Sequence, residues 1–264
     1  HLSGAEVSAQ IYAKEAFNVP MELRANPAEI ERAAKFLLES TSPLMEVGFE
    51  ISQCHANESV VELAELLAIP VAQHSRSFHC DFPNFHPLHI GYLRNVQSYL
   101  QHYPHQIDAV ISIGTRAQQG MEGFMRNRRI PLIHASVDPE KIGRNTPTAV
   151  GLVGDIELIA RDLVEAIKSM ASPAQLKQRT EERRAKVAAY SAGKHAGIRE
   201  AGRLSKGDPV PWQRLMFELN ELMDPDAVLV EELGQGERTL SSIAFSPDAS
   251  WLAACDLKKL PRPR

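Results

Sequence analysis

The chain has 264 residues, a formal net charge of -4 and 44% hydrophobic residues, so we expect one or two soluble domains of ordinary composition. The negative charge argues against a nucleic-acid binder, and no apolar run is long enough to span a membrane. The three cysteines, Cys54, Cys80 and Cys255, contain no short-spaced pair, which favours a reducing, cytoplasmic location. The chain starts at His1 without an initiator methionine, so we expect a piece of a longer protein.

The first clear element is a helix that starts at Asn26. The Asn26 side chain can cap it, and Pro27 suits its first turn. A strand at 43–48, a helix at 57–67 and a second strand at 69–72 follow. Strand, helix and strand at this spacing form a βαβ unit, so the sheet is expected to be parallel.

The middle of the chain continues this alternation. After an irregular segment at 74–92, we expect a helix at 96–103 and strands at 108–114, 130–135 and 150–153. These apolar, β-branched runs end abruptly in Gly, Arg, Asp or Pro, which is how buried parallel strands end at a ligand crevice. The pattern predicts a Rossmann-like α/β fold, with a parallel sheet and helices on both of its faces.

The C-terminal part reads as a connector followed by a new unit. Asp155 is placed to cap the helix that follows the last of these strands. A charged helix at 172–192 is expected to be solvent-exposed, and the density of glycine and proline at 193–209 indicates a linker. A helix at 211–223 and a strand at 227–230 then predict the start of a partial second α/β domain.

Several short motifs, in a fixed order, carry a family resemblance. They are Phe82-Pro83-x-x-His86-Pro87-Leu88-x-x-Gly91, the strand at 109–116, Asp138-Pro139-Glu140-Lys141-Ile142-Gly143 and Val153-Gly154-Asp155. Over roughly residues 26–170, the sequence resembles the central domain of thiamine-diphosphate-dependent enzymes of the acetolactate synthase, benzoylformate decarboxylase and oxalyl-CoA decarboxylase group. Each motif alone is weak, but their common order and spacing are specific.

The resemblance implies four segments. These are an N-terminal linker segment at 1–25, the central α/β domain at 26–171, a connector helix and linker at 172–209, and a truncated start of the thiamine-diphosphate-binding domain at 210–264. In the last segment it implies Gly234 and Gln235 as contacts of thiamine diphosphate.

The same resemblance implies an enzyme, a lyase or transferase that acts on small 2-keto acids by decarboxylation or acetolactate-synthase-like carboligation. Thiamine diphosphate and Mg²⁺ would be the cofactors, and the complete enzyme would be a homodimer or homotetramer. The family's Gly-Asp-Gly…Asn metal motif and its domain with the activating Glu are not recognisable in this sequence. We therefore assign no catalytic or metal-binding residue, and we expect this chain alone to be inactive.

In some relatives the central domain binds FAD or ADP at the carboxyl ends of its strands. The corresponding candidates here are Gly91, Gly114, Arg116, Asp138, Ile142 and Asp155. Gly114 would let a ligand approach the backbone, Arg116 could bind a phosphate, and the aspartates could bond a ribose or a ring. The alternative function is thus a non-catalytic nucleotide-binding or structural module, and Asp155 can also be no more than a helix cap.

Two other kinds of site have less support. His74, His79, Cys80, His86 and His89 suggest zinc, but their spacing matches no common ligand pattern, so we expect packed loop side chains. The sequence contains no Gly-x-Ser-x-Gly, and no Gly-x-Gly-x-x-Gly follows a strand, so a serine hydrolase and the usual dinucleotide fingerprint are not supported.

Overall fold

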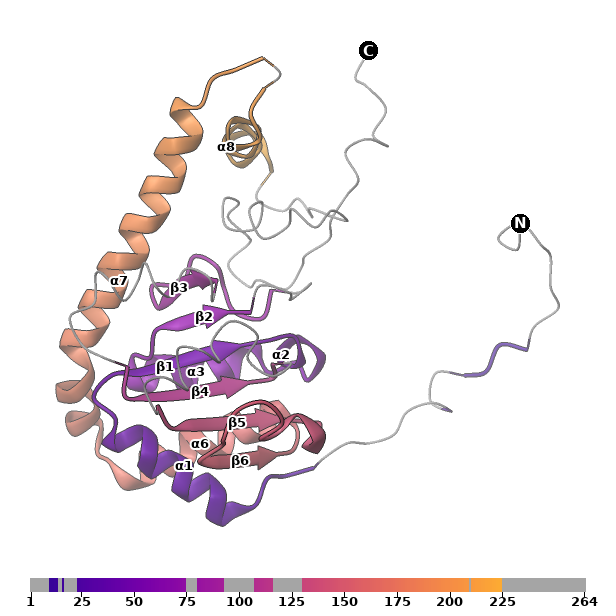
Figure 1. Ribbon diagram of the computed structural model, residues 1–264, viewed down its shortest axis with the longest axis vertical. Helices are drawn as coiled ribbons and strands as arrows, with labels where there is room; N and C mark the ends of the chain where they lie inside the picture. The colour runs from indigo at the N-terminus through magenta and orange to yellow at the C-terminus, as the bar shows by residue number, and fades with distance from the viewer. Residues whose placement is uncertain are drawn as a thin grey trace.

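The centre of the protein is a six-stranded, fully parallel sheet in the order β3-β2-β1-β4-β5-β6 (Figure 1). This computed structural model describes residues 10–13, 16, 23–74, 80–92, 107–115, 130–208 and 210–224. The strands are β1 (Pro43–Val47), β2 (Val71–Gln73), β3 (His89–Tyr92), β4 (Ala109–Ile113), β5 (Leu132–Ser136) and β6 (Val150–Val153). The direction of strand addition reverses between β1 and β4, and ligands of open α/β sheets bind at such a switch point.

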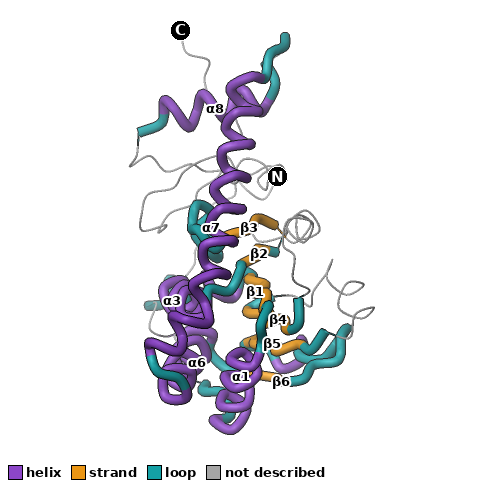
Figure 2. The backbone as a smooth tube through the Cα atoms, turned by 90° about the vertical axis from the view of Figure 1, so that its left-hand side faces the viewer, coloured by secondary structure: helices purple, strands orange, loops and turns teal. Residues whose placement is uncertain are grey.

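Helices α1 (Pro27–Glu39), α3 (Asn57–Leu67) and α6 (Ile156–Met170) lie side by side on one face of the sheet (Figure 2). The predicted α/β fold with a parallel sheet is therefore confirmed. The segments 93–106 and 116–129, which join β3 to β4 and β4 to β5, lie outside the described residues, so the predicted helices on the second face are not tested.

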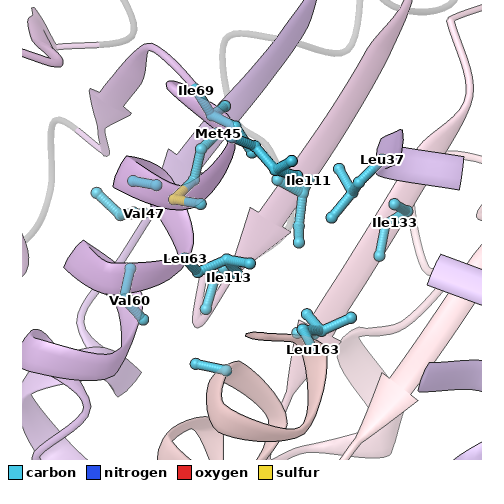
Figure 3. Close-up of a cluster of buried hydrophobic side chains, with 14 of the residues drawn as sticks. Leu37, Met45, Val47, Val60, Leu63, Ile69, Ile111, Ile113, Ile133 and Leu163 are labelled. Atoms are coloured by element: carbon cyan, nitrogen blue, oxygen red, sulfur yellow. The ribbon is translucent and has the colours of Figure 1, made fainter. Parts of the chain in front are cut away.

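The hydrophobic core fills the space between these helices and the sheet. Side chains from alternate strand positions, such as Met45, Ile111 and Ile133, meet Leu63 of α3 and Leu163 of α6 (Figure 3). All five are at most 1% exposed. Because successive strand residues point to opposite faces, this core uses every second residue of β1, β4 and β5.

The predicted N-caps of α1 and α6 are confirmed. The Asn26 side chain accepts a hydrogen bond from the Ala28 amide at 3.0 Å, and Asp155 accepts from the amides of Glu157 and Leu158 at 2.9 and 3.2 Å. Each bond satisfies a backbone donor that a first helical turn leaves without an intrahelical partner.

Two predictions about secondary structure were wrong. Residues 89–92 were expected to be irregular but form β3, which pairs with β2 across a register shift. This short strand contains Gly91 and two polar positions, so it lacks the apolar alternation that marks longer strands. The predicted helix at 96–103 and strand at 227–230 lie outside the described residues.

The charged helix was predicted to end at residue 192, but α7 (Pro173–Leu204) continues through the glycine-rich segment. A helical glycine costs about 1 kcal/mol relative to alanine, and packing can offset this. At Gly202 a Cβ would lie 2.9 Å from the Cβ of Phe217, so the missing side chain lets α8 (Trp212–Leu222) approach α7. Tertiary contact overrides local propensity at this position.

Two short elements, α2 (Glu50–Gln53) and the 3-10 helix η4 (Pro139–Lys141), follow β1 and β5 at the carboxyl edge of the sheet. None of the described helices combines the length and the apolar character that a bilayer-spanning helix requires.

Candidate functional site

The candidate site is the edge of the sheet where β1, β4 and β5 end, next to the switch point. Gly48 and Gly114 follow β1 and β4. A Cβ on Gly48 would lie 2.6 Å from the carbonyl oxygen of Gly114, and a Cβ on Gly114 would lie 2.8 Å from the Cβ of Glu50. Gly114 also has a φ of +65°, which favours glycine. The close approach that sequence reasoning attributed to a ligand is thus made here by α2 of the protein itself.

Glu50 is the central acidic group of this edge and is fully buried. Its carboxylate accepts hydrogen bonds at 3.0 Å from the Ser136 hydroxyl and at 3.0 Å from the Val137 amide, and a third from Lys141 Nζ. A buried carboxylate needs such partners because its desolvation is costly. These bonds join α2, which follows β1, to the end of β5 and to η4.

Lys141 completes this arrangement. Besides its ion pair with Glu50, its Nζ lies 3.9 Å from Asp138 Oδ2 and 5.0 Å from the centre of the Phe49 ring. Its side chain is 16% exposed. The positive charge at this edge is therefore held by the protein's own carboxylates and an aromatic face.

A second polar group lies on the sheet surface that faces away from α1, α3 and α6. Glu46, Ser112 and His134 occupy one row across β1, β4 and β5. Ser112 donates to Glu46 Oε2 at 2.7 Å, and its oxygen lies 2.8 Å from Thr115 Oγ1. Burial raises the pKa of Glu46 to about 7, against the opposing hydrogen bond from Ser112. Burial, and then the positive charge of Lys141, lowers the pKa of His134 to about 4.

The geometry does not make this row a nucleophilic triad. In a triad, histidine accepts the serine proton and the carboxylate orients the histidine. Here the serine lies between the other two and donates to the carboxylate directly. All three residues are at most 1% exposed, so a substrate would not reach the hydroxyl. The row is a buried polar layer in which Ser112 and Thr115 solvate a carboxyl group.

The structure places five of the predicted nucleotide contacts among its described residues. Asp155 caps α6, and its own amide donates to the Leu23 carbonyl at 2.8 Å. Asp138 caps η4 by accepting from the Glu140 amide at 3.0 Å. Both aspartate side chains thus accept hydrogen bonds from backbone amides at the start of a helix. Their binding of a nucleotide stays a prediction.

Ile142 and Gly91 have less direct roles. Ile142 ends η4, and a Cβ on Gly151 would lie 2.8 Å from its Cγ2, so it packs closely over β6. Gly91 has a φ of +109° in β3, at the opposite end of the sheet order from β6. Four of the predicted residues, namely Gly114, Asp138, Ile142 and Asp155, follow β4, β5 and β6, whereas Gly91 stands apart. Arg116, Gly234 and Gln235 lie outside the described residues.

Sequence reasoning missed Glu46, Glu50 and Lys141. The available signal was a charged residue inside an otherwise apolar strand, Pro43-Leu44-Met45-Glu46-Val47. A strand that is buried on both faces brings such a residue into the interior, where it requires partners. The partners come from β4, β5 and η4, which are distant in the sequence.

The histidines of the zinc hypothesis pack against aromatic and polar neighbours. The ring of Phe82 lies edge-on to His86 at 5.1 Å, and His86 Nε2 lies 3.2 Å from Glu65. His89 Nδ1 hydrogen-bonds the Asn84 carbonyl at 2.8 Å, and burial lowers the pKa of His89 to about 3. Among the described residues, no three His, Cys, Asp or Glu side chains are grouped as metal ligands; His79 is not described.

The described edge does not fit a diphosphate. Lys141 is already paired with Glu50, and Asp155 occupies the N-terminus of α6, where a phosphate would otherwise bind. Asp138 adds another carboxylate beside Lys141. The described edge thus has three carboxylates, Glu50, Asp138 and Asp155, beside one ammonium, Lys141, and is acidic on balance.

Comparison with known proteins identifies the fold. The family model described as the thiamine pyrophosphate enzyme central domain matches residues 30–163, slightly more than half of the 264 residues. The chain belongs to the thiamine pyrophosphate enzyme family. The sequence resemblance and the fold class are thereby confirmed.

Individual proteins similar to this chain belong to the same family of enzymes. The probable acetolactate synthase large subunit of Methanocaldococcus jannaschii is 32% identical over 145 residues, 54% of this chain and 24% of that protein. The acetolactate synthase of Mycobacterium bovis is 26% identical over 233 residues, 85% of this chain and 36% of that protein. The structure of benzoylformate decarboxylase from Polynucleobacter necessarius superposes with a TM-score of 0.60 at 18% identity, over 93% of this chain and 43% of that one. The chain thus spans less than half the length of these relatives.

Proposed function

We propose that this chain is the central part of a thiamine-diphosphate- and magnesium-dependent enzyme that acts on 2-keto acids, by decarboxylation or acetolactate-synthase-like carboligation. The match of a thiamine pyrophosphate enzyme central domain to residues 30–163 carries the proposal. The similarity to an acetolactate synthase over 85% of the chain, which extends beyond that domain, supports it. The homodimer or homotetramer expected of the complete enzyme is part of the proposal.

Within this proposal the described residues have a structural task. The charged groups at the carboxyl edge, Glu50 and Lys141, satisfy each other, and the row around Glu46 is buried. Neither group is placed to contact a substrate. We therefore assign the chemistry to residues outside the described core, where thiamine diphosphate would supply the electron sink.

An activity assay tests the proposal. The chain is incubated with pyruvate or benzoylformate, thiamine diphosphate and Mg²⁺, and release of CO₂ and formation of acetolactate are measured. We expect no turnover by the chain alone, and cofactor-dependent turnover by the protein encoded by the complete reading frame. Turnover by the chain alone would refute the assignment of chemistry to other segments. A complete protein without a thiamine response would refute the function.

A titration separates the nucleotide-binding alternative. Calorimetry with FAD and ADP is expected to show no tight binding by this chain, because Lys141 is engaged and the edge is acidic. Micromolar binding of either nucleotide, together with no response to thiamine diphosphate in the complete protein, would support a non-catalytic module instead.

A further inference from the structure

One stripe of α7 packs against the rest of the domain. Its buried residues in this part are Leu176, Thr180, Arg183, Val187 and Ser191. Spacings of three and four residues put these five on one side of a helix. We call this stripe the docking face of α7. Only two of its members, Leu176 and Val187, are apolar. Burial of hydrocarbon alone therefore contributes little to the packing of this 32-residue helix against the domain.

Arg183 is the buried charged member of the docking face, with 9% of its surface exposed. Its Nη1 donates to the carbonyl of Thr41 at 2.8 Å, and its Nη2 donates to the carbonyl of Leu67 at 2.7 Å. Thr41 lies just beyond α1, and Leu67 is the last residue of α3. Carbonyls at a helix C-terminus lack intrahelical donors and carry partial negative charge, so a guanidinium suits them.

Two exposed arginines repeat this contact from the same helix. Arg179 donates to the carbonyl of Leu38, in the last turn of α1, at 2.6 Å, and Arg184 donates to the carbonyl of Glu65, in the last turn of α3. The bonds made by Arg183 differ because one is buried, the other is partly buried, and together they reach two separate segments. A planar guanidinium can do this because its donors lie on separate nitrogens, whereas the three donors of an ammonium all lie on one nitrogen.

Beyond the docking face, α7 runs past the sheet toward α8 (Figure 1). Ser191 donates to the His89 carbonyl in β3 at 3.0 Å. One turn later, Lys194 Nζ donates to the same carbonyl at 3.4 Å, and the His195 ring stacks on the Phe85 ring at 4.5 Å. The following turns pack against α8, where Gly202 meets Phe217. The direction of the α7–α8 pair is therefore set by contacts of α7 between Leu176 and His195.

We propose that Arg183 is a positioning residue that fixes the direction of α7, and with it α8, by joining α7 to the ends of α1 and α3. The α7–α8 pair is then a rigid extension of the central domain. The end of α8 is then held at a defined angle to the sheet. The proposal rests on the contacts of α7 alone and does not depend on the chemistry of the enzyme.

Hydrogen exchange measured by mass spectrometry on the whole chain tests this role. Arg183→Met keeps the hydrocarbon stem and removes both bonds. We expect exchange in residues 173–191 to become at least about tenfold faster, because an undocked, largely polar helix is marginal in water. Peptides from β1, β4 and β5 should keep their wild-type rates.

Three variants make the test specific. Arg184→Met, which loses one exposed bond on the same helix, should change exchange less than about twofold. The exchange rate of residues 173–191 in Arg183→Lys should lie between the rates of the wild type and Arg183→Met. If Arg183→Met does not fold, Ser191→Ala should still raise exchange locally in α7. Unchanged protection of α7 in Arg183→Met, or equal loss of protection in α7 and the sheet, would overturn the proposal.

Discussion

The two faces of β1, β4 and β5 are built on opposite principles. Toward α1, α3 and α6, the strands present Met45, Ile111 and Ile133, which form a continuous apolar core (Figure 3). On the other face, the neighbouring residues Glu46, Ser112 and His134 form a polar row. Both sets are buried. Burial alone therefore does not describe this sheet, because one face excludes polar atoms and the other must satisfy them.

The hydrogen-bonding groups of the polar face are satisfied only in part. Ser112 bonds one oxygen of Glu46, while Glu46 Oε1 and His134 Nε2 have no hydrogen-bond partner among the residues that the structure describes. A buried carboxyl without full solvation is easier to protonate, which agrees with the raised pKa of Glu46. The apolar face should therefore dominate stability, and the polar face should make stability depend on pH.

The largest expected effect is on the apolar face. Ile111→Ala removes a side chain that is fully buried between the sheet and the helices. We expect a loss of about 4 kcal/mol in the free energy of unfolding, from lost burial and a residual cavity. Urea denaturation followed by circular dichroism measures it. A loss below about 1 kcal/mol would show that the core relaxes freely and would weaken the contrast between the faces.

The next effect is at the carboxyl edge. Lys141→Met leaves the Glu50 carboxylate buried without its cation, and we expect a loss of about 3 kcal/mol. The double variant Lys141→Met with Glu50→Gln should lose less than the sum of the two single variants, since the uncompensated charge is gone. Additive losses would mean that the two side chains do not interact in solution.

Glu46→Gln tests the polar row through pH. The pKa of Glu46 is about 7 in the folded protein and near 4.5 in an unfolded chain, so the folded state binds more protons between these values. The contribution of Glu46 is complete below pH 4.5 and is lost as the pH rises through 7, by about 3 kcal/mol. The pKa values of His89 and His134 are lowered, so their effect on stability has the opposite sign. Their stabilising contribution is present above about pH 6.5 and is lost as the pH falls below it.

Urea denaturation at a series of pH values measures this difference. The stability of the wild type minus that of Glu46→Gln should fall steadily between pH 4.5 and 7, while the histidine contribution cancels. A constant difference for Glu46→Gln would show that Glu46 is ionised and solvated in the folded protein.

The smallest effect is expected at Ser112. Ser112→Ala removes the donor to Glu46 and should cost about 1 kcal/mol. In a Glu46→Gln background the loss should differ, because the acceptor is then a neutral amide. Thermal denaturation of the four proteins forms the cycle, and a zero coupling energy would show that the hydrogen bond contributes nothing measurable.

Sequence periodicity predicted most of the fold. The strands at 43–48, 108–114 and 130–135 are apolar runs long enough to recognise, and the caps at Asn26 and Asp155 mark their helices. The short β3 and the length of α7 were not predictable in this way. Both depend on contacts with other segments, through β2 for the first and α8 for the second.

The candidate site was predicted less well. The Val-Gly-Asp and Asp-Pro motifs correctly marked chain segments at the carboxyl edge. The structure gives them backbone roles: Asp155 caps a helix, and a Cβ on Gly154 would lie 2.6 Å from the Leu23 carbonyl oxygen. Glu50 carried no motif, since nothing in its neighbourhood shows that Ser136 and Lys141 will meet it.

The sequence by itself determined the parallel α/β fold, the caps and the family, because hydrophobic period, turn residues and ordered motifs are local signals. Only the tertiary structure decided which charges are buried and what satisfies them. Glu46, Glu50 and Arg183 each find partners that are more than sixty residues away in the chain. Whether a charged residue is solvated by water or by the protein depends on which segments the fold brings beside it, and no local pattern contains that information.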